Sequence, residues 1–253
     1  MSNLRFYSAE NLQIGATIKL SDNAAAHATR VMRLNVGDGL TLFNGDGFDY
    51  SCELMSVKKS EALVIVKSSV KVENESNLSI TLLQGISAGD RMEYTLQKAV
   101  ELGVTNIIPI KTERSVVKLS PERAEKRLEH WQNIVVSACE QSGRAVIPQL
   151  EAPTTMALWL AKTPSSFKEE GEGEGKPLRI TLDPLSTLRL HDLSKPDGNI
   201  ELLVGAEGGL SKEELSVATQ NGFSGVQLGK RILRTETAPL AAIAAMQTLW
   251  GDF

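Results

Sequence analysis

Two glycine-rich segments near the carboxyl end of the chain combine residue types from which a ligand site could be built. They are residues 205–209 (GAEGG) and residues 229–237 (GKRILRTET). Each follows a short apolar stretch, residues 202–204 and 226–228, that is typical of a buried strand. Glycine lets the backbone bend sharply or approach a ligand closely, and loops at the carboxyl ends of strands form the binding sites of α/β sheets. The two segments are therefore predicted to frame one pocket.

The charged side chains of these segments suit electrostatic chemistry. Arg234 stands just before a predicted helix that begins near Thr237 and has Pro239 in its first turn. Because the helix dipole disfavours a cation at this end, a structural Arg234 would need a carboxylate partner. Glu207 and Glu236 are the candidates for that partner.

A purely structural interpretation stays open from these patterns alone. The glycines of residues 205–209 fit a tight strand-to-helix turn about as well as they fit a ligand. Leu233, Leu240 and Ile243 are more typical of a core than of a pocket.

Several other chemistries lack their motifs. The sequence contains no GxGxxG, GxxxxGK[ST], HExxH or GxSxG pattern. The histidines His27, His130 and His191 lie in unrelated segments. Cys52 and Cys139 have no partner at metal-ligand spacing, which favours reduced structural thiols of a cytoplasmic protein over a catalytic thiol. Without these motifs, we expect catalysis to depend on positioning of the reactants and on electrostatic stabilisation by charged side chains.

The elements that must position these loops follow a strand–helix–strand pattern, which predicts a parallel α/β sheet. Ser211 and Glu214 have capping-box spacing for one of its helices, and the Ala- and Leu-rich helix after residue 237 is expected to be buried almost all round. The predicted strands are residues 78–83, 107–110, 180–182, 202–204 and 226–228. The other predicted helices are residues 90–102, 120–143 and 211–221.

The first 72 residues predict a separate β-rich unit, a small barrel. A helix is expected at residues 27–34, and the polar residues 72–77 form the predicted linker. Alternating or β-branched stretches separated by turns predict strands at residues 17–20, 39–43, 50–56 and 62–70.

Length and composition permit one large domain or two smaller ones. The chain has 253 residues, 42% of them apolar, and a formal net charge of -4. No apolar run approaches the roughly 18 residues of a membrane span, and the N-terminus has no hydrophobic signal core. The net charge argues against nucleic acid as a partner, but much of the acidity gathers around residues 164–177, a low-complexity stretch expected to be a surface insertion. A local basic surface can still form elsewhere.

Taken together, the GxEGG and LGxRILRxETA motifs resemble those of the SPOUT superfamily of S-adenosylmethionine-dependent RNA methyltransferases, and within it the RsmE family of 16S ribosomal RNA uridine N3-methyltransferases. The segments HATRVMRLNVGD, DRMEYTLQKAVELGV, TERSVV and EHWQNIVVSACEQSGR extend the resemblance over nearly the whole chain. Ala206 stands where the family usually has proline, which loosens the backbone of that loop.

The resemblance implies an N-terminal PUA-like β-barrel that binds RNA, residues 1–72, and a SPOUT α/β methyltransferase domain, residues 73–253. It also implies a trefoil knot in about residues 200–250, an exception to the rule that chains do not thread themselves. It further implies a cytoplasmic homodimer that modifies 16S ribosomal RNA within the small ribosomal subunit, with no metal and no membrane partner.

The implied cofactor is S-adenosylmethionine, held mainly by backbone groups, and Arg234 would steady the uracil anion. The residues predicted to bind the cofactor are Leu83, Leu203, Val204, Gly205, Glu207, Gly208, Leu228, Gly229, Ile232, Leu233, Arg234 and Thr237. The predicted catalytic residues are Arg234, Arg114, Glu140, Gln141 and Arg144, the last four from the dimer face. The predicted RNA contacts are Arg30, Arg33, Arg91, Lys230 and Arg231; spacing alone would make Arg30 and Arg33 only a solvated helix face.

Two other functions stay open from the sequence. One is a SPOUT ribose 2'-O-methyltransferase, and the other is a non-catalytic RNA-binding factor of ribosome assembly that keeps the fold. The complete RILRTETA stretch favours an enzyme.

Overall fold

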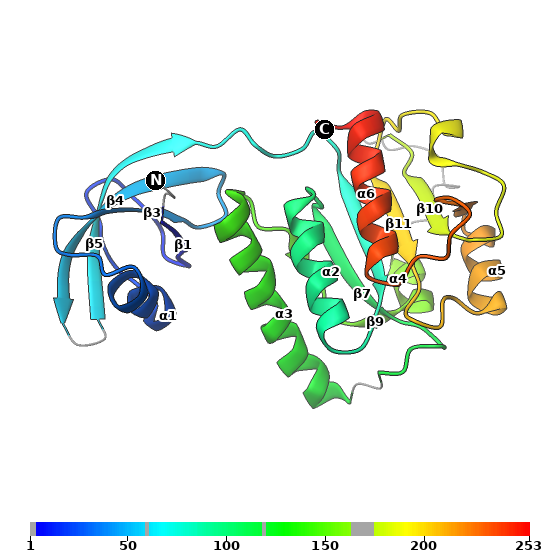
Figure 1. The fold of residues 1–253 in the computed structure, drawn as a ribbon, viewed down its shortest axis with the longest axis horizontal. Helices are drawn as coiled ribbons and strands as arrows, with labels where there is room; N and C mark the ends of the chain where they lie inside the picture. The colour runs from blue at the N-terminus through cyan, green and yellow to red at the C-terminus, as the bar shows by residue number, and fades with distance from the viewer. Residues whose placement is uncertain (1–3, 59–60, 118–119, 163–174) are drawn as a thin grey trace. The chain divides into compact units, whose positions relative to one another are not determined.

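A computed structural model describes residues 4–58, 61–117, 120–162 and 175–253 of the chain (Figure 1). These residues form two compact units. The first comprises Met1–Glu75 and Val136–Ile147, and the second comprises Ser76–Val135 and Pro148–Phe253. Most of the acidic stretch predicted at residues 164–177 lies outside the described residues.

The first unit is built on a five-stranded sheet with strand order β1-β3-β4-β5-β2. β1 pairs with β3 in parallel, and the other pairings are antiparallel. Every second side chain of β4 and β5 is buried over much of their length, as expected for a sheet with one face on a core, and Leu42, Leu54 and Val64 of that core have no exposed surface. The strands are β1 (Arg5–Tyr7), β2 (Thr17–Lys19), β3 (Gly39–Phe43), β4 (Phe48–Lys58) and β5 (Glu61–Lys71).

The helix expected at residues 27–34 begins earlier and ends earlier than predicted. α1 (Asp22–Ala26) is capped by Ser21, whose hydroxyl accepts a hydrogen bond from the Ala24 amide at 3.2 Å. A π-helical turn, His27–Val31, continues it. Arg33 then has a φ of 57°, in the left-handed region, which ends the helical path.

The C-terminal end of a long helix completes the first unit through a buried arginine. The Arg5 guanidinium pairs with Asp49 at 2.6 Å, donates to the carbonyl of Cys139 at 2.8 Å, and donates to the carbonyl of Arg144 at 3.1 Å. The Arg5 side chain is only 6% exposed. Because buried donors need acceptors, β1 depends on residues more than 130 positions later in the chain.

Two predicted catalytic side chains belong to this same network. Arg144 is 6% exposed and pairs with Glu75 at 2.6 Å. Glu140 accepts a hydrogen bond from the Tyr7 amide at 2.9 Å, and burial raises the pKa of its carboxyl above the usual range despite that hydrogen bond. Both side chains have structural partners within the first unit.

The two cysteines are free thiols in the cores, as the sequence predicts. Burial raises the pKa of each thiol to about 11. A thiol with this pKa is almost fully protonated at neutral pH, so neither Cys52 nor Cys139 is a ready nucleophile.

The second unit contains a parallel sheet with strand order β12-β10-β11-β6-β7-β8, and β9 also pairs with β7. Every residue of β6 and β11 is buried, which is typical of central parallel strands covered on both faces. The strands are β6 (Ile80–Gly85), β7 (Asn106–Lys111), β8 (Gln149–Leu150), β9 (Thr154–Thr155), β10 (Leu178–Leu182), β11 (Ile200–Val204) and β12 (Ser224–Val226). Because β12 ends at Val226, the predicted strand at residues 226–228 is two residues too late.

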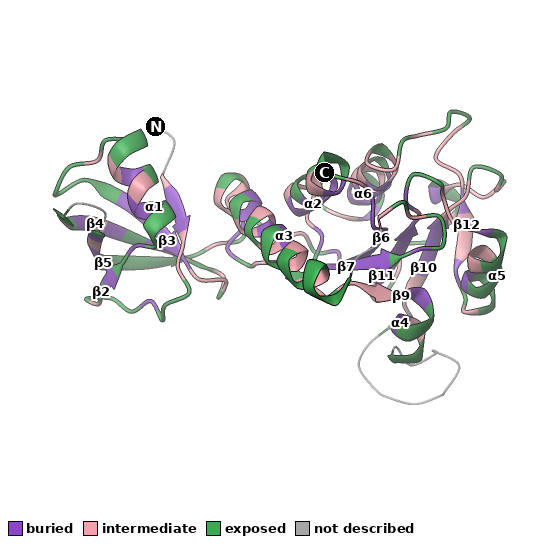
Figure 2. Cartoon of the chain, turned by 90° about the horizontal axis from the view of Figure 1, so that it is seen from below, coloured by how far each residue is buried: buried purple, intermediate pink, exposed green. Residues whose placement is uncertain are grey.

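Helices lie on both faces of this sheet, with α2 and α6 on one face and α4 on the other (Figures 1 and 2). Met156 and Trp159 of α4 share a core cluster with Ala218 of α5 and with strand residues. The helices are α2 (Asp90–Glu101), α3 (Pro121–Ser142), α4 (Met156–Lys162), α5 (Lys212–Gln220) and α6 (Thr237–Trp250). Within the described residues, no helix has the length and apolar character needed to cross a membrane.

Two features of these helices bear on the predictions. The capping box of α5 is confirmed, since Ser211 accepts from the Glu214 amide and the Glu214 side chain accepts from the Ser211 amide. The prediction that α6 is buried almost all round is wrong for the single chain. Leu249 is 45% exposed, while the face that contains Ile243 and Met246 is buried.

We expect the Arg144–Glu75 pair to be a major source of stability for the first unit. Arg144→Ala leaves the Glu75 carboxylate without its cation, and breaking a buried pair in this way costs about 3 kcal/mol. Arg123→Ala, on the exposed start of α3, is the control and is expected to change stability by less than about 0.5 kcal/mol. Urea unfolding of both variants measures the difference, and equal stabilities would contradict a structural role for Arg144.

Candidate functional site

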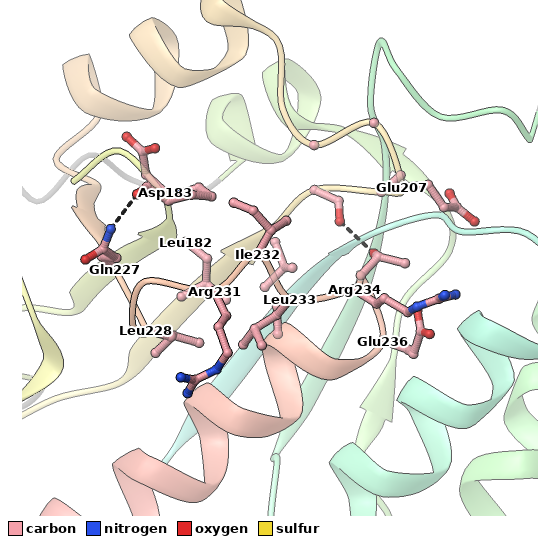
Figure 3. Close-up of a pocket in the computed structure, with 18 of the residues that line it drawn as sticks. Leu182, Asp183, Glu207, Gln227, Leu228, Arg231, Ile232, Leu233, Arg234 and Glu236 are labelled. Atoms are coloured by element: carbon pink, nitrogen blue, oxygen red, sulfur yellow. Dashed lines mark hydrogen bonds between the residues drawn. The ribbon is translucent and has the colours of Figure 1, made fainter.

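A cavity of about 590 Å³ lies at the carboxyl ends of β10, β11 and β12 (Figure 3). This is the edge of the sheet at which α/β proteins bind their ligands. All of its lining belongs to the second compact unit. The lining comes from residues 182–184, 204–209, 226–229 and 231–236, together with Arg91 and Ala238.

Two glycines of the first segment, Gly205 and Gly208, leave no room for a side chain. A Cβ atom on Gly205 would lie 2.6 Å from the backbone of Gly209, and one on Gly85, at the end of β6, would lie 2.4 Å from the amide nitrogen of Ala206. A Cβ atom on Gly208 would lie 2.7 Å from Cβ of Arg114. Contacts this short exclude any other residue unless the backbone moves, so the glycines permit a dense meeting of backbones that faces the cavity.

The second glycine segment is joined to the first by a threonine. The Thr235 hydroxyl donates to the carbonyl of Gly205 at 2.9 Å, as the dashed line in Figure 3 shows. The Gln84 side-chain amide, at the end of β6, lies 3.4 Å from the same hydroxyl. The ends of β6 and β11 are therefore connected to the second glycine segment through one small side chain.

Apolar side chains cover much of the cavity wall. Leu182, Leu228, Ile232 and Leu233 all line it, and Ile232 is 78% exposed although it is a large aliphatic residue. An exposed apolar side chain in a concave site gains free energy when a ligand covers it. This wall suits a flat or aliphatic part of a ligand.

A group of charged side chains lies at one side of the cavity. Arg91, in the first turn of α2, pairs with Glu207 at 3.0 Å and lies 4.0 Å from Glu236. Partial burial opposes ionisation of Glu207, but hydrogen bonds from the Ala88 amide, its own amide and Arg91 outweigh burial and lower its pKa. Glu207 is therefore an anion throughout the neutral pH range.

Arg234 lines the cavity close to these carboxylates (Figure 3). Its carbonyl accepts hydrogen bonds from the Thr237 and Ala238 amides at the start of α6. Among the described residues, no side chain hydrogen-bonds to or forms an ion pair with its guanidinium. A structural arginine at a helix N-terminus would need such a partner, so the side chain is available to a ligand.

The predicted cofactor residues are largely brought together. Leu83 and Leu203 are fully buried within the sheet and Thr237 is exposed at the start of α6, so these three do not line the cavity. The other nine do line it: Val204, Gly205, Glu207, Gly208, Leu228, Gly229, Ile232, Leu233 and Arg234.

The other predicted site residues are divided between the two units. Arg114 lies beside the first glycine segment, where its guanidinium donates to the Gly208 carbonyl at 3.2 Å. Arg91 and Arg231, predicted to contact RNA, line the cavity, and Lys230 is exposed next to them. The predicted residues in the first unit do not line the cavity; these are Glu140, Gln141, Arg144, Arg30 and Arg33, of which Gln141, Arg30 and Arg33 are exposed.

The sequence analysis missed one side of the cavity. Leu182, Asp183 and Pro184 follow β10, and the Gln227 side chain donates to the Pro184 carbonyl at 2.6 Å. The Asp183 carboxylate accepts from the Leu185 amide at 2.9 Å. The available signal was the Asp-Pro pair after a predicted strand, because the strand-end rule applies to this strand as well.

Comparison with protein families gives two matches. Residues 74–247 match the family model described as an RNA methyltransferase domain, and residues 20–67 match an RNA methyltransferase PUA domain. The chain is 35% identical over 249 residues to the ribosomal RNA small subunit methyltransferase E of Buchnera aphidicola (Schizaphis graminum), covering 98% of this chain and 97% of that protein. It is 32% identical to the protein of the same name from Bacillus subtilis, covering 96% of each.

Two solved structures are similar over the whole chain. One is a ribosomal RNA small subunit methyltransferase E from Neisseria gonorrhoeae bound to S-adenosyl methionine, with 45% identity, a TM-score of 0.88 and 99% coverage of both chains. The other is a putative methyltransferase from Legionella pneumophila in complex with the cofactor SAM, with 36% identity, a TM-score of 0.92 and full coverage of both chains.

We expect Gly205→Ala to disrupt the cavity. The added Cβ would lie 2.6–2.8 Å from backbone atoms of Gly209 and Leu210, which cannot move aside as a flexible side chain could. The free energy of unfolding should fall by about 1–3 kcal/mol, as for other overpacked sites. Gly39→Ala is the control, because its Cβ would meet only one atom, at 3.9 Å. Equal thermal stabilities of the two variants would contradict the tight packing.

Proposed function

This chain belongs to the ribosomal RNA small subunit methyltransferase E family, and from that premise we propose that it transfers a methyl group from S-adenosylmethionine to N3 of a uridine in 16S ribosomal RNA. The observation that carries the proposal is the strand-end cavity, whose lining combines two glycine segments, an apolar wall and an arginine without a side-chain partner. The proposed substrate, a uridine of 16S ribosomal RNA, follows from membership of the family. The proposed position of the site follows from the location and lining of the cavity.

The residues of the cavity fit this cofactor. A volume of about 590 Å³ lies within the range of roughly 300–1,000 Å³ typical of small-molecule sites. The backbone of residues 203–205 and 228–233 can hydrogen-bond an adenine while Leu228 and Ile232 cover its faces. Glu207 and Glu236 provide negative charge near a ligand that is positively charged at sulfur. The absence of side chains on Gly205 and Gly208 lets the backbone of Gly209 and the Arg114 side chain pack directly against this loop.

The chain's own residues must lower the cost of removing the uracil imide proton. When bound, the cofactor supplies an activated methyl group, and the reaction forms an N–C bond, breaks a C–S bond and releases the N3 proton. No histidine is among the residues that line the cavity. The Arg234 guanidinium can instead stabilise the negative charge that develops on a uracil carbonyl oxygen, because a fixed cation costs no reorganisation when the charge forms.

The proposal includes an assembly and a location. A cytoplasmic homodimer, acting on ribosomal RNA of the small subunit, would allow a second chain to contribute polar groups to the cavity. Exposed apolar residues on the helices that flank the cavity, such as Leu249 of α6 and Tyr94 of α2, support a further contact surface. The proposal also includes a knotted path through residues 200–250, which is taken from the family.

The activity is tested with ribosomal RNA that lacks the modification. Small subunits and free 16S ribosomal RNA from a strain without its own enzyme of this type are incubated with the protein and labelled cofactor, and the product nucleoside is mapped by mass spectrometry. We expect 3-methyluridine. A ribose-methylated product would favour a 2'-O-methyltransferase, and binding of RNA without any product would favour an assembly factor.

We expect the methyl-transfer rate to depend on Arg234 and to rise with pH. Measured at saturating cofactor and RNA, Arg234→Ala should lower the single-turnover rate by about 100-fold, the magnitude found when one donor to a developing oxyanion is removed, while sparing the fold. Lys212→Ala, at the exposed start of α5, is the control. In the wild type the rate should increase from about pH 6 to pH 8 without levelling near histidine's usual pKa of about 6.5.

A different pH profile would argue for another mechanism. If the rate reaches a plateau above pH 7, and replacement of His27, His130 or His191 removes the titration, a histidine base takes part and Arg234 is not the main aid to deprotonation.

A further inference from the structure

The charged group beside the cavity connects three separate segments of the second unit. Arg91 lies in the first turn of α2, and Glu207 lies in the first glycine segment. Glu236 lies in the second glycine segment and is the N-cap residue of α6. The Arg91 Nη1 atom lies 3.0 Å from Oε1 of Glu207, and its Nε atom lies 4.0 Å from Oε2 of Glu236. One guanidinium therefore faces both glycine segments at once.

The Glu207 carboxylate is held by two hydrogen bonds. The same Oε1 atom that takes the Arg91 hydrogen bond also accepts from the Ala88 amide at 2.8 Å. Two donors from residues 88–91 thus converge on one carboxylate oxygen of the first glycine segment. The lowered pKa of Glu207 keeps this carboxylate charged at neutral pH, so the attraction persists under the conditions in which a ligand binds.

The contact with Glu236 explains a buried charge. The Oε2 atom of Glu236 is buried and has no hydrogen-bond partner among the described residues. The start of α6 favours a carboxylate electrostatically, and Arg91 provides a cation within 4.0 Å. Without Arg91, the buried oxygen would keep only the helix dipole as compensation, and uncompensated buried charge is costly.

We propose that Arg91 is a positioning residue for the cofactor cavity, which holds residues 205–209 and 229–236 at the spacing that the cofactor requires. This role differs from the RNA contact predicted from the sequence. A planar guanidinium can address two carboxylates with separate nitrogens, whereas a lysine ammonium is a single point charge. The identity of the side chain therefore matters as well as its sign.

The inference rests on the proposed function, because the readout is binding of S-adenosylmethionine. Cofactor affinity is measured by calorimetry without RNA for the wild type, Arg91→Ala, Arg91→Lys, Glu207→Gln and the double variant Arg91→Ala/Glu207→Gln. Lys98→Ala is the matched control, since Lys98 lies on the same helix and pairs with Glu101 at 2.7 Å, outside the cavity. Affinity for 16S ribosomal RNA is measured in parallel at several salt concentrations.

We expect Arg91→Ala and Arg91→Lys to weaken cofactor binding by about tenfold, and Lys98→Ala to leave it unchanged. Since Arg91 acts partly through Glu207, the loss of cofactor affinity in the double variant should be smaller than the sum of the losses in Arg91→Ala and Glu207→Gln. In steady-state assays the Michaelis constant for the cofactor should rise more than the turnover number falls. If Arg91→Ala does not fold, Arg91→Lys decides the question.

Two results would overturn the inference. Variants that bind the cofactor within about twofold of the wild type, but bind RNA more weakly and with a salt dependence reduced by about one charge, would show that Arg91 contacts RNA instead. A wild-type protein that binds no S-adenosylmethionine would refute the proposed function itself, and with it the role given to Arg91.

Discussion

The cavity depends on backbone atoms approaching one another more closely than any side chain would permit. The end of β6 lies against the amide of Ala206, and the Gly205 backbone lies against that of Gly209. These contacts place three strand ends, from β6, β10 and β11, next to the loop that follows β12. The polar contacts made by Thr235 and Arg91 can form only because the glycines have already brought the segments within reach. The close backbone approach at Gly85 and Gly205 thus allows the hydrogen bonds of Thr235 and Arg91 to form.

Local sequence patterns predicted the longer elements of the second unit, because its central strands are short buried runs and its longer helices have clear start and stop residues. The short elements β8, β9 and α4 were not predicted. The apolar residues 202–204 of β11 and the GAEGG turn that follows them placed the cavity at the sheet edge where it is found. The part missed, Asp183 with Gln227, requires knowledge that β10 lies between β11 and β12. Strand order is set by long-range packing, so no local pattern in residues 180–184 shows which loops they will face.

The remaining differences have the same origin. Arg144 is a polar residue at a helix end, which made it a plausible catalytic group, but its partner Glu75 lies 69 positions away. Likewise, Arg91 was predicted to contact RNA because it is a cation near a loop, and the structure places two carboxylates from distant segments beside it. A charge on its own says nothing about whether the fold supplies a counter-charge. The exposure of Leu249 on α6 is a similar case. An apolar composition predicts that a helix is buried, but it does not say whether the same chain or a second chain buries it.

The division of α3 between the two compact units has a consequence for how the protein is made. The carbonyl of Cys139 that accepts the Arg5 hydrogen bond is synthesised 134 residues after Arg5. At translation rates of about 5–20 residues per second, this separation of 134 residues lasts roughly 7–27 seconds. During that interval the N-terminal sheet can form its apolar core but holds a guanidinium without all of its acceptors. The first unit therefore cannot be complete until residues 136–147 have been synthesised.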